Sequence, residues 1–354
     1  MLLTNTSQLL LRNSALLKAK SPLLINMPAD DLHIELLALN PLSDIHFFTN
    51  NYAQYQHYKK VKSTRIFYFF SAYYHENTLH DLVVIHFPKS KQELAFTLAM
   101  IAICTELDSQ ILIVGDNKGG IKSLKKLTEN SFTACEKIDA ARHCLLFQAQ
   151  LSQSNDIFNI EKWFYYYQIN INTTLFTIAT LPGVFSQAKL DKGTAILLEV
   201  LGEIEIPTSH TKLLDFGCGA GVIACFIGLT RPETELHLTD VSALAIASAK
   251  KTLEINNLNG QVFATDSLSN ITETYQHIIS NPPFHQGVKT NYQATEQFLS
   301  GIQPHLSDGG TLTIVANSFL HYQSMIKQSL GHSEELYKKA GFTVYHAKNN
   351  PAKQ

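Results

Sequence analysis

Residues 280–287 read SNPPFHQG. Their side chains could bind a substrate, and their backbone could hold those side chains in place. Two consecutive prolines exclude helix and favour a rigid, extended turn. The apolar residues HIIS lead into it as a strand, and loops at strand ends are where open α/β proteins place binding groups. We therefore expect Asn281 and Phe284 to be held in fixed directions, with a plain strand-terminating turn as the alternative for this motif alone.

A second candidate is the glycine-rich turn LLDFGCGAGV, which carries Asp215, Gly217, Gly219 and Gly221. Glycines permit a sharp turn and let a ligand approach the backbone without a Cβ in the way. A dinucleotide site would follow G-x-G-x-x-G, but the position of its third glycine holds Val222. The spacing predicts a ligand-binding turn.

Two further carboxylates end strand-like segments, Asp240 after ELHLT and Asp266 after QVFAT. A carboxylate at the first position could accept both hydroxyls of a ribose, and one at the second could line an adenine pocket. Each taken singly could equally cap the next helix. Together with Asp215 they flank one crevice at three strand ends, which fits an adenosine-bearing ligand with no phosphate to neutralise.

The elements that must position these residues alternate between strand and helix throughout the second half of the chain, which predicts a mostly parallel, doubly wound α/β sheet. The first half repeats the order more faintly, with strand, proline turn and helix in DLVVIHFPKSKQELAFTLAM, then strand and glycine turn in QILIVGDNKGG, and a helix over 121–130. We infer a degenerate duplicate. The expected domains are residues 1–155, a linker and domain start at 156–185, and a ligand-binding domain at 186–354.

The combination of DFGCGAG, a strand-end Asp and a later NPPF resembles the class I S-adenosylmethionine-dependent methyltransferases that modify exocyclic or amide nitrogens. The segments TLPGVFSQAKLDKG, SNPPFHQG and IVANSFLHYQSMIKQSLG narrow this to a resemblance to the bacterial 16S rRNA guanine-N2 methyltransferase family. The resemblance implies two tandem Rossmann-like methyltransferase domains, of which only the C-terminal one keeps the S-adenosyl-L-methionine site. It also implies methylation of guanine N2 at position 1207 of 16S rRNA, in the assembled 30S subunit.

The same resemblance assigns roles to residues. The Asn281 side-chain oxygen and the Pro282 carbonyl oxygen would accept the two N–H bonds of the target amine, and Phe284 would stack on the base. Phe185 and Asp191 would lie at the methionine end of the cofactor, and Asp215, Gly217, Gly219, Gly221, Asp240 and Asp266 would complete its site.

The composition of the chain limits which functions and locations are possible. The chain has 354 residues, 45% hydrophobic and 16% charged, with no apolar run long enough to span a membrane. Five cysteines without metal-binding spacing suggest reduced thiols in the cytoplasm. His285, His321 and His332 share no ligand spacing, so no metal is expected, and a monomer is assumed. The net charge of −2 requires any RNA contact to come from a local basic patch, for which 58–62, 88–91 and the lysines of 118–126 are candidates, with solvated helix faces as the alternative explanation.

Three alternatives remain at this point. A protein glutamine-N5 methyltransferase would use the same NPP geometry, but usually with Tyr where this chain has Phe284 and with a helical N-terminal domain. A DNA adenine-N6 methyltransferase is a second alternative enzyme. A nucleotide-binding scaffold without catalysis belongs to another class, and the intact NPPF beside an intact DFGCGAG argues against it for the C-terminal half.

Overall fold

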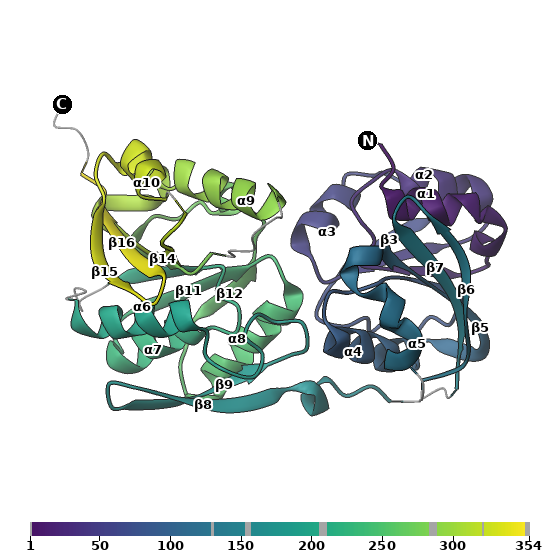
Figure 1. The fold of residues 1–354 in the computed structure, drawn as a ribbon, viewed down its shortest axis with the longest axis horizontal. Coiled ribbons are helices and arrows are strands. Elements are labelled where there is room, and N and C mark those ends of the chain that lie inside the picture. Colours follow the sequence, from purple (N-terminus) through teal and green to yellow (C-terminus); the bar gives the residue numbers. More distant parts are fainter. Residues whose placement is uncertain are drawn as a thin grey trace. The chain divides into compact units, whose positions relative to one another are not determined.

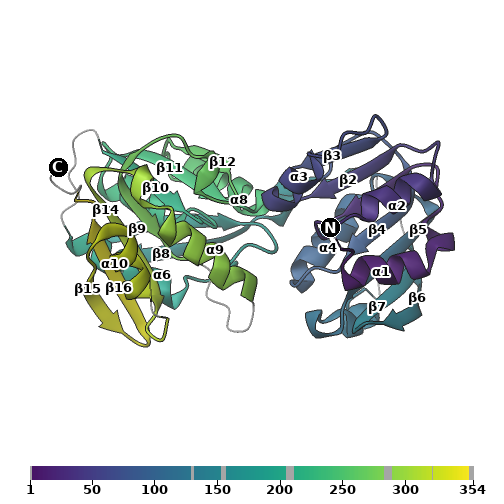
Figure 2. The same cartoon turned by 90° about the horizontal axis from the view of Figure 1, so that it is seen from above.

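The computed structural model describes residues 2–128, 131–152, 157–204, 211–282, 289–320 and 322–350. The chain divides into two compact units, Met1–Trp163 and Phe164–Gln354. Each unit has a seven-stranded sheet with helices on both faces, as Figure 1 and Figure 2 show. No helix in the described ranges combines the length and apolar composition needed to cross a bilayer.

The sheet of the second unit has the order β12-β11-β10-β13-β14-β16-β15. Its strands are β10 (Lys212–Phe216), β11 (Glu235–Asp240), β12 (Gln261–Ala264), β13 (Tyr275–Ser280), β14 (Leu306–Asn317), β15 (Glu334–Lys339) and β16 (Phe342–Lys348). The first five are parallel, and β16 runs antiparallel to both β14 and β15. The strand order reverses between β10 and β13, so a crevice is expected beyond the carboxyl ends of these strands.

Two layers of helices enclose this sheet (Figure 1). One face carries α6 (Lys192–Glu203), α7 (Val222–Thr230) and α8 (Ala243–Ile255), and the other carries α9 (Lys289–Ser300) and α10 (Tyr322–Leu330). Short 3-10 turns lie at η5 (Leu268–Asn270) and η6 (Gln303–His305). The core on the α9 side joins Leu214, Ile278 and Leu312 of the sheet to Phe298 and Ile326 of the helices.

A two-stranded hairpin, β8 (Tyr165–Ile171) and β9 (Thr174–Thr180), opens the second unit and packs on α8. Asn256 at the end of α8 donates from Nδ2 to the Thr177 carbonyl oxygen at 2.7 Å, and Thr252 Oγ1 accepts from the Ala179 N–H at 3.1 Å. The hairpin is therefore fixed to the helical layer by hydrogen bonds between its backbone and the side chains of Thr252 and Asn256.

The first unit repeats this plan, with the sheet order β3-β2-β1-β4-β5-β7-β6. Its strands are β1 (Pro22–Ile25), β2 (Ile45–Thr49), β3 (Ile66–Phe70), β4 (His80–His86), β5 (Thr105–Asp116), β6 (Phe132–Ala141) and β7 (Cys144–Leu151). Numbered within each unit, the two orders are identical, and in each the sixth and seventh strands are antiparallel to one another.

The helices of the first unit are distributed as in the second. One hydrophobic core contains residues of α1 (Asn5–Arg12), α2 (Leu32–Leu39) and α3 (Tyr52–Tyr58), and the other contains residues of α4 (Lys91–Ile101) and α5 (Leu124–Leu127). Four 3-10 turns complete the unit: η1 (Ser14–Leu17), η2 (Asn117–Gly119), η3 (Ile121–Ser123) and η4 (Ile160–Trp163). The inferred duplication is thus visible as a repeated architecture.

One predicted element is wrong. The helix expected over 121–130 is a 3-10 turn followed by the four-residue α5. Gly120, with φ of 93°, precedes the 3-10 turn. Thr128 ends α5 by donating from Oγ1 to the Leu124 carbonyl oxygen at 2.8 Å, a bond that competes with helix continuation.

Candidate active site

The glycine turn after β10 holds three left-handed residues in five positions, Gly217, Gly219 and Gly221, with φ of 73°, 53° and 77°. A Cβ added at Gly217 or Gly219 would meet no atom within 4 Å, so the backbone is open there to a ligand. A Cβ at Gly221 would lie 3.2 Å from the Ala249 Cα, which makes this glycine a requirement of helix packing.

Asp240, at the carboxyl end of β11, lies beside this turn. One carboxylate oxygen accepts from the Gly219 N–H at 2.9 Å, and the other accepts from the Ser242 N–H at 2.9 Å. Partial burial raises the pKa of Asp240, while these backbone N–H groups act to lower it. The carboxylate is thereby fixed in direction, and each oxygen keeps a lone pair that could accept from a ribose hydroxyl.

Asp215 lies behind the turn and is fully buried. Its Oδ2 accepts from the Ala224 N–H at 3.1 Å, which ties β10 to the first turn of α7. Its Oδ1 has no hydrogen-bond partner among the described residues. Burial, with a smaller contribution from the charge of Asp240, raises the pKa of Asp215 to about 7. Asp215 shapes the turn from inside, and its predicted contact with a cofactor stays a prediction.

Two more of the residues expected near the cofactor, Asp266 and Phe185, are accessible. Asp266 follows β12 at the same edge of the sheet as Asp240 and is exposed. Phe185, in the segment between β9 and α6, is 57% exposed. Nothing in their contacts specifies a ligand, and both stay predictions.

Asn281, directly after β13, has its amide direction fixed by α6. Its Nδ2 donates to Thr194 Oγ1 at 2.7 Å and to Asp191 Oδ2 at 3.2 Å. A carboxylate can only accept hydrogen bonds, so the NH2 end of the amide must face Asp191 and the Oδ1 end must face away. The end of β13 is itself attached to β10, because Ser280 Oγ donates to the Phe216 carbonyl oxygen at 2.7 Å.

Of the other two residues of the predicted substrate loop, the structure describes one and not the other. Pro282 is described and buried. Phe284 lies outside the described residues, as do His285 and His321. The structure thus gives the contacts of Asn281 and the burial of Pro282, and the substrate-binding roles of Asn281, Pro282 and Phe284 stay predictions.

Asp191 was predicted to lie at the methionine end of a cofactor, and the structure assigns it two other contacts. It is the N-cap of α6, where Oδ2 accepts from the Thr194 N–H at 3.0 Å, and the same oxygen accepts from Asn281. Thr194, which sequence reasoning missed, completes the support of Asn281. The spacing DKGT, with an acid three residues before a hydroxyl at a helix start, was the available signal.

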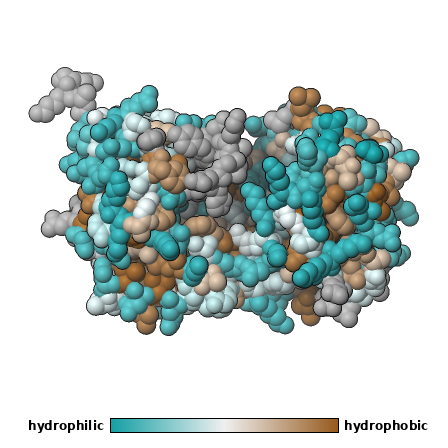
Figure 3. Space-filling view, viewed as in Figure 1, coloured by the Kyte–Doolittle hydropathy of each residue, from teal (hydrophilic) through white to brown (hydrophobic). Residues whose placement is uncertain are grey.

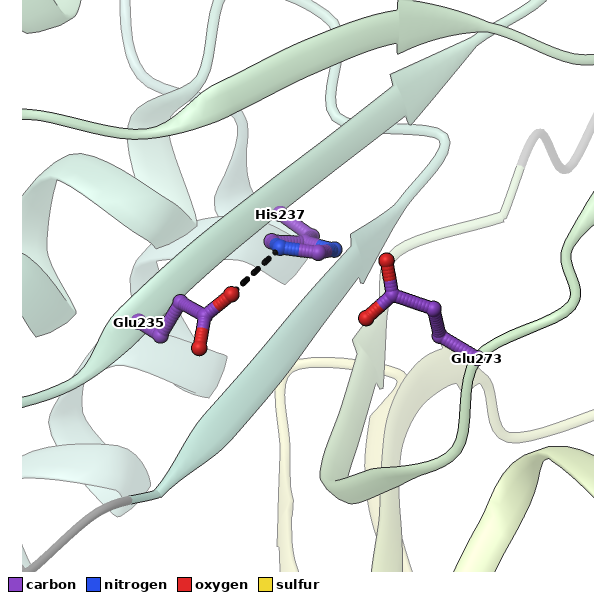
Figure 4. A group of neighbouring side chains, drawn as sticks. All are labelled: Glu235, His237 and Glu273. Carbon is purple, nitrogen blue, oxygen red and sulfur yellow. Dashed lines mark hydrogen bonds and ion pairs between the residues drawn. The ribbon is translucent and has the colours of Figure 1, made fainter.

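A separate cluster lies at the opposite edge of the sheet, where Glu235, His237 and Glu273 face one another (Figure 4). Lys212 Nζ contacts Glu235 at 3.4 Å and also forms an ion pair with Glu273. His237 uses both ring nitrogens, Nε2 with Glu235 at 3.0 Å and Nδ1 with the Tyr275 hydroxyl at 3.1 Å. Since a lysine already balances the carboxylates, we interpret this cluster as an ion-pair network.

Comparison with known proteins supplies the context for this geometry. Residues 7–167 match the model of the methyltransferase small domain N-terminal family, and residues 175–346 match that of the methyltransferase small domain. A solved structure described as Thermus thermophilus 16S rRNA N2 G1207 methyltransferase (RsmC) in complex with AdoMet and guanosine shares the fold. It has a TM-score of 0.80 at 20% identity and covers 95% of this chain and 91% of its own.

Two curated relatives named ribosomal RNA small subunit methyltransferase C are similar over nearly their whole length. The protein of Colwellia psychrerythraea is 50% identical, with 98% of each chain covered. That of Pseudoalteromonas translucida is 39% identical, covering 97% of this chain and 98% of its own. The family resemblance and the two tandem methyltransferase domains expected from the sequence are confirmed. The chain belongs to the ribosomal RNA small subunit methyltransferase C family.

Proposed function

We propose that the second unit transfers a methyl group from S-adenosylmethionine to the exocyclic N2 of a guanine in 16S rRNA. The Thermus thermophilus relative is named for G1207, and we infer the same target position for this chain. We further propose that the protein acts as a monomer, in the cytoplasm, on the assembled 30S subunit.

The residues present fit S-adenosylmethionine. The turn leaves its backbone open at Gly217 and Gly219, and Asp240 offers a fixed carboxylate beside it. This pairing suits an adenosine with free ribose hydroxyls, since an anionic group would be repelled by Asp240. When bound, the cofactor supplies a methyl group on a positively charged sulfur.

Asn281 performs the central task in this proposal. The lone pair of guanine N2 is delocalised into the ring, so the amine is a poor nucleophile. Asn281 Oδ1 and the Pro282 carbonyl oxygen would accept its two N–H bonds, which orients the amine and stabilises the positive charge that grows on it. The proton released afterwards can pass to water, so no general base is required of the chain.

The observation that carries the proposal is the fixed amide of Asn281. A residue serving only as a strand-end turn would need no carboxylate and hydroxyl from the start of α6 to set its orientation. Asp191, which can only accept, directs the NH2 group of Asn281 toward α6 and so leaves the amide oxygen for the substrate.

The test is single-turnover transfer of labelled methyl to 30S subunits and to protein-free 16S rRNA, followed by mapping of the modified nucleotide. Asn281→Ala should lower the rate by roughly 10²–10³, as loss of one preorganised acceptor does. Cofactor affinity, measured by calorimetry, should stay unchanged. Wild-type rates from this variant, or labelling elsewhere than a guanine N2, would refute the proposal.

The first unit, we propose, has lost the cofactor site and positions RNA. Its Asn26 N–H donates to the Phe48 carbonyl oxygen at 2.8 Å, as the Gly217 N–H donates to that of Thr239 at 2.9 Å. The place of Gly217 is thus taken by Asn26, and the next residue of β2, Thr49, stands where Asp240 stands in β11. We expect one cofactor per chain on titration, and two equivalent sites would contradict this.

A further inference from the structure

The loops at the carboxyl edge of the first unit's sheet can be matched residue by residue with the active-site loops of the second. Strand pairing sets the register: Leu24 pairs with Val84 as Asp215 pairs with Ile279. Counting onward along the chain, HFPK at 86–89 corresponds to NPPF at 281–284. By this count along the sequence Lys89 corresponds to Phe284, which lies outside the described residues and is expected to stack on the base.

The β6–β7 turn matches as well. Arg142 and His143 connect these strands with φ of 51° and 63°, and Ala340 and Gly341 connect β15 to β16 with φ of 51° and 83°. The Asn117 N–H donates to the His143 carbonyl oxygen at 2.8 Å, as the Ser318 N–H does to Gly341. Arginine is an unfavourable residue for a left-handed position, so turn stability does not explain its presence.

Five exposed cations lie on these matched loops: Lys89, Lys91, Lys118, Lys122 and Arg142, together called the basic rim. Since β4 and β5 are adjacent parallel strands and β7 pairs with β5, all three loops lie at one edge of the sheet. Hydrophilic side chains make up much of the face of this unit drawn in Figure 3.

The cations of the basic rim have few carboxylates to pair with in the fold. Within the described residues, no rim cation forms an ion pair, although the charge of Lys89 acts to lower the pKa of Glu93. Lys91 is the first residue of α4 and Lys89 lies just before its N-cap, where a cation is opposed by the helix dipole. The carboxylates nearest along these loops are Glu93, whose pKa is raised by burial, and Asp116.

Asp30 and Asp31, after β1 at the same edge, have partners of their own. Asp30 accepts from the Thr4 N–H at 2.8 Å and from the Leu32 N–H at 3.0 Å, and it is fully buried. The basic rim therefore keeps an excess of positive charge in a protein whose net charge is −2.

We propose that the basic rim binds the phosphate backbone of the substrate RNA. The inference rests on the proposed function, and it assigns to the first unit the same edge that the second unit uses for chemistry. In the first unit a lysine corresponds to the aromatic residue of the substrate loop, and further cations lie on the neighbouring loops. These changes would turn an edge that binds a base into one that binds phosphate, because phosphate contacts need Lys and Arg.

The variant that tests this is Lys118→Ala with Lys122→Ala in the full chain. Its matched control is Lys60→Ala with Lys62→Ala. These two lysines are exposed and precede β3, so they lie at the opposite edge of the same sheet. Both double variants remove two exposed positive charges from the same unit. Binding to protein-free 16S rRNA is measured by filter retention from 0.05 to 0.3 M salt.

The rim variant should bind roughly 10- to 50-fold more weakly at 0.1 M salt, with a salt slope smaller by about 1.4–1.8. The control should stay within about twofold of wild type. S-adenosylmethionine affinity and the methylation rate at saturating RNA should be unchanged in both. Equal affinities for the rim and control variants would overturn the proposal.

A loss confined to 30S subunits, with naked RNA bound normally, would also overturn it and point to an acidic ribosomal protein as the partner. Failure of the proposed function is a different result, since wild-type protein would then methylate no guanine whatever its RNA affinity. Binding and chemistry are scored separately, so the two failures are distinguishable.

Discussion

The direction of the Asn281 amide depends on one carboxylate, which makes Asp191→Asn the sharpest test of the site. Asparagine caps helices as well as aspartate does, so α6 should keep its N-terminus. The new amide can donate or accept, however, whereas the carboxylate only accepts. Asn281 then loses the partner that forbids its reversed orientation, in which an NH2 group would face the amine of the guanine.

The magnitude follows from the two hydrogen bonds that hold Asn281. The bond to Asp191, at 3.2 Å, involves a charge and is worth about 1.5–3 kcal/mol, whereas a neutral replacement is worth about 0.5–1.5 kcal/mol. The difference of about 1–1.5 kcal/mol corresponds to a roughly 5- to 12-fold lower rate of methyl transfer. Thr194→Val, which removes the 2.7 Å bond, should lower the rate by a similar factor.

The assay is single-turnover methyl transfer at saturating RNA, with cofactor affinity measured separately by calorimetry. Glu199→Gln is the matched control, because it makes the same chemical change on the same helix at a carboxylate whose only described ion pair is with Lys339. We expect Asp191→Asn to slow the chemical step at unchanged cofactor affinity. Weaker cofactor binding with a normal chemical step would refute the positioning role and restore Asp191 as a contact of the cofactor.

Three further predictions concern single groups. Asp240→Ala should weaken S-adenosylmethionine binding by about 1–3 kcal/mol in calorimetry, because it leaves buried polar partners unpaired. Asp215 has its pKa raised from 3.8 to about 7, so the folded protein holds a proton that the unfolded chain releases, and stability falls as pH rises from about 4 to 7. Asp215→Asn should abolish this loss, seen as a gain of about 2–4 kcal/mol in urea unfolding at pH 8 relative to wild type and little gain at pH 4. His80 is buried with its pKa lowered to about 4, so the unfolded chain takes up the proton first, and the first unit should lose about 3 kcal/mol as pH falls from 6.5 to 4, a loss that His80→Asn would largely remove in the same titration.

Much of the second unit could be predicted because its central strands are buried on both faces. Such strands read as short apolar runs closed by glycine or aspartate, and KLLDFG at 212–217 became β10 with its turn. The start of α8 could be predicted equally well, because Ser242 caps this helix by accepting from the Ala245 N–H at 3.4 Å. In these segments local preference and tertiary burial agree.

The strands that were not predicted lack this agreement between local preference and burial. β1 begins at a proline and has only four residues, and nothing like the glycine turn follows it. β15, EELYKK, is an edge strand with most of its side chains exposed, so no hydrophobic alternation marks it. Only pairing with β16 makes it a strand, and pairing is information that a local pattern does not contain.

The support of Asn281 was beyond sequence reasoning for a related reason. Thr194 and Asn281 are separated by 87 residues and meet only because α6 packs on β14 and β16 near the end of β13. The motifs DKGT and SNPPF each predict a local feature, a helix start and a rigid turn. Their contact decides which end of the Asn281 amide faces α6, and this contact is a property of the fold.

The two sheets, built alike, differ in the groups that their strand ends present. Where the second unit leaves backbone open at Gly217, the first has Asn26, whose Oδ1 accepts from the Asn50 N–H at 2.9 Å. Where Asp240 offers a carboxylate, Thr49 donates from Oγ1 to Gln54 at 2.6 Å. Polar groups that would face a ligand in one unit face their own chain in the other. A duplicated domain could lose a ligand without losing stability in this way, because these two polar groups keep partners within the chain. The exposed loops at that edge are then free to change charge, and in this chain they have become basic.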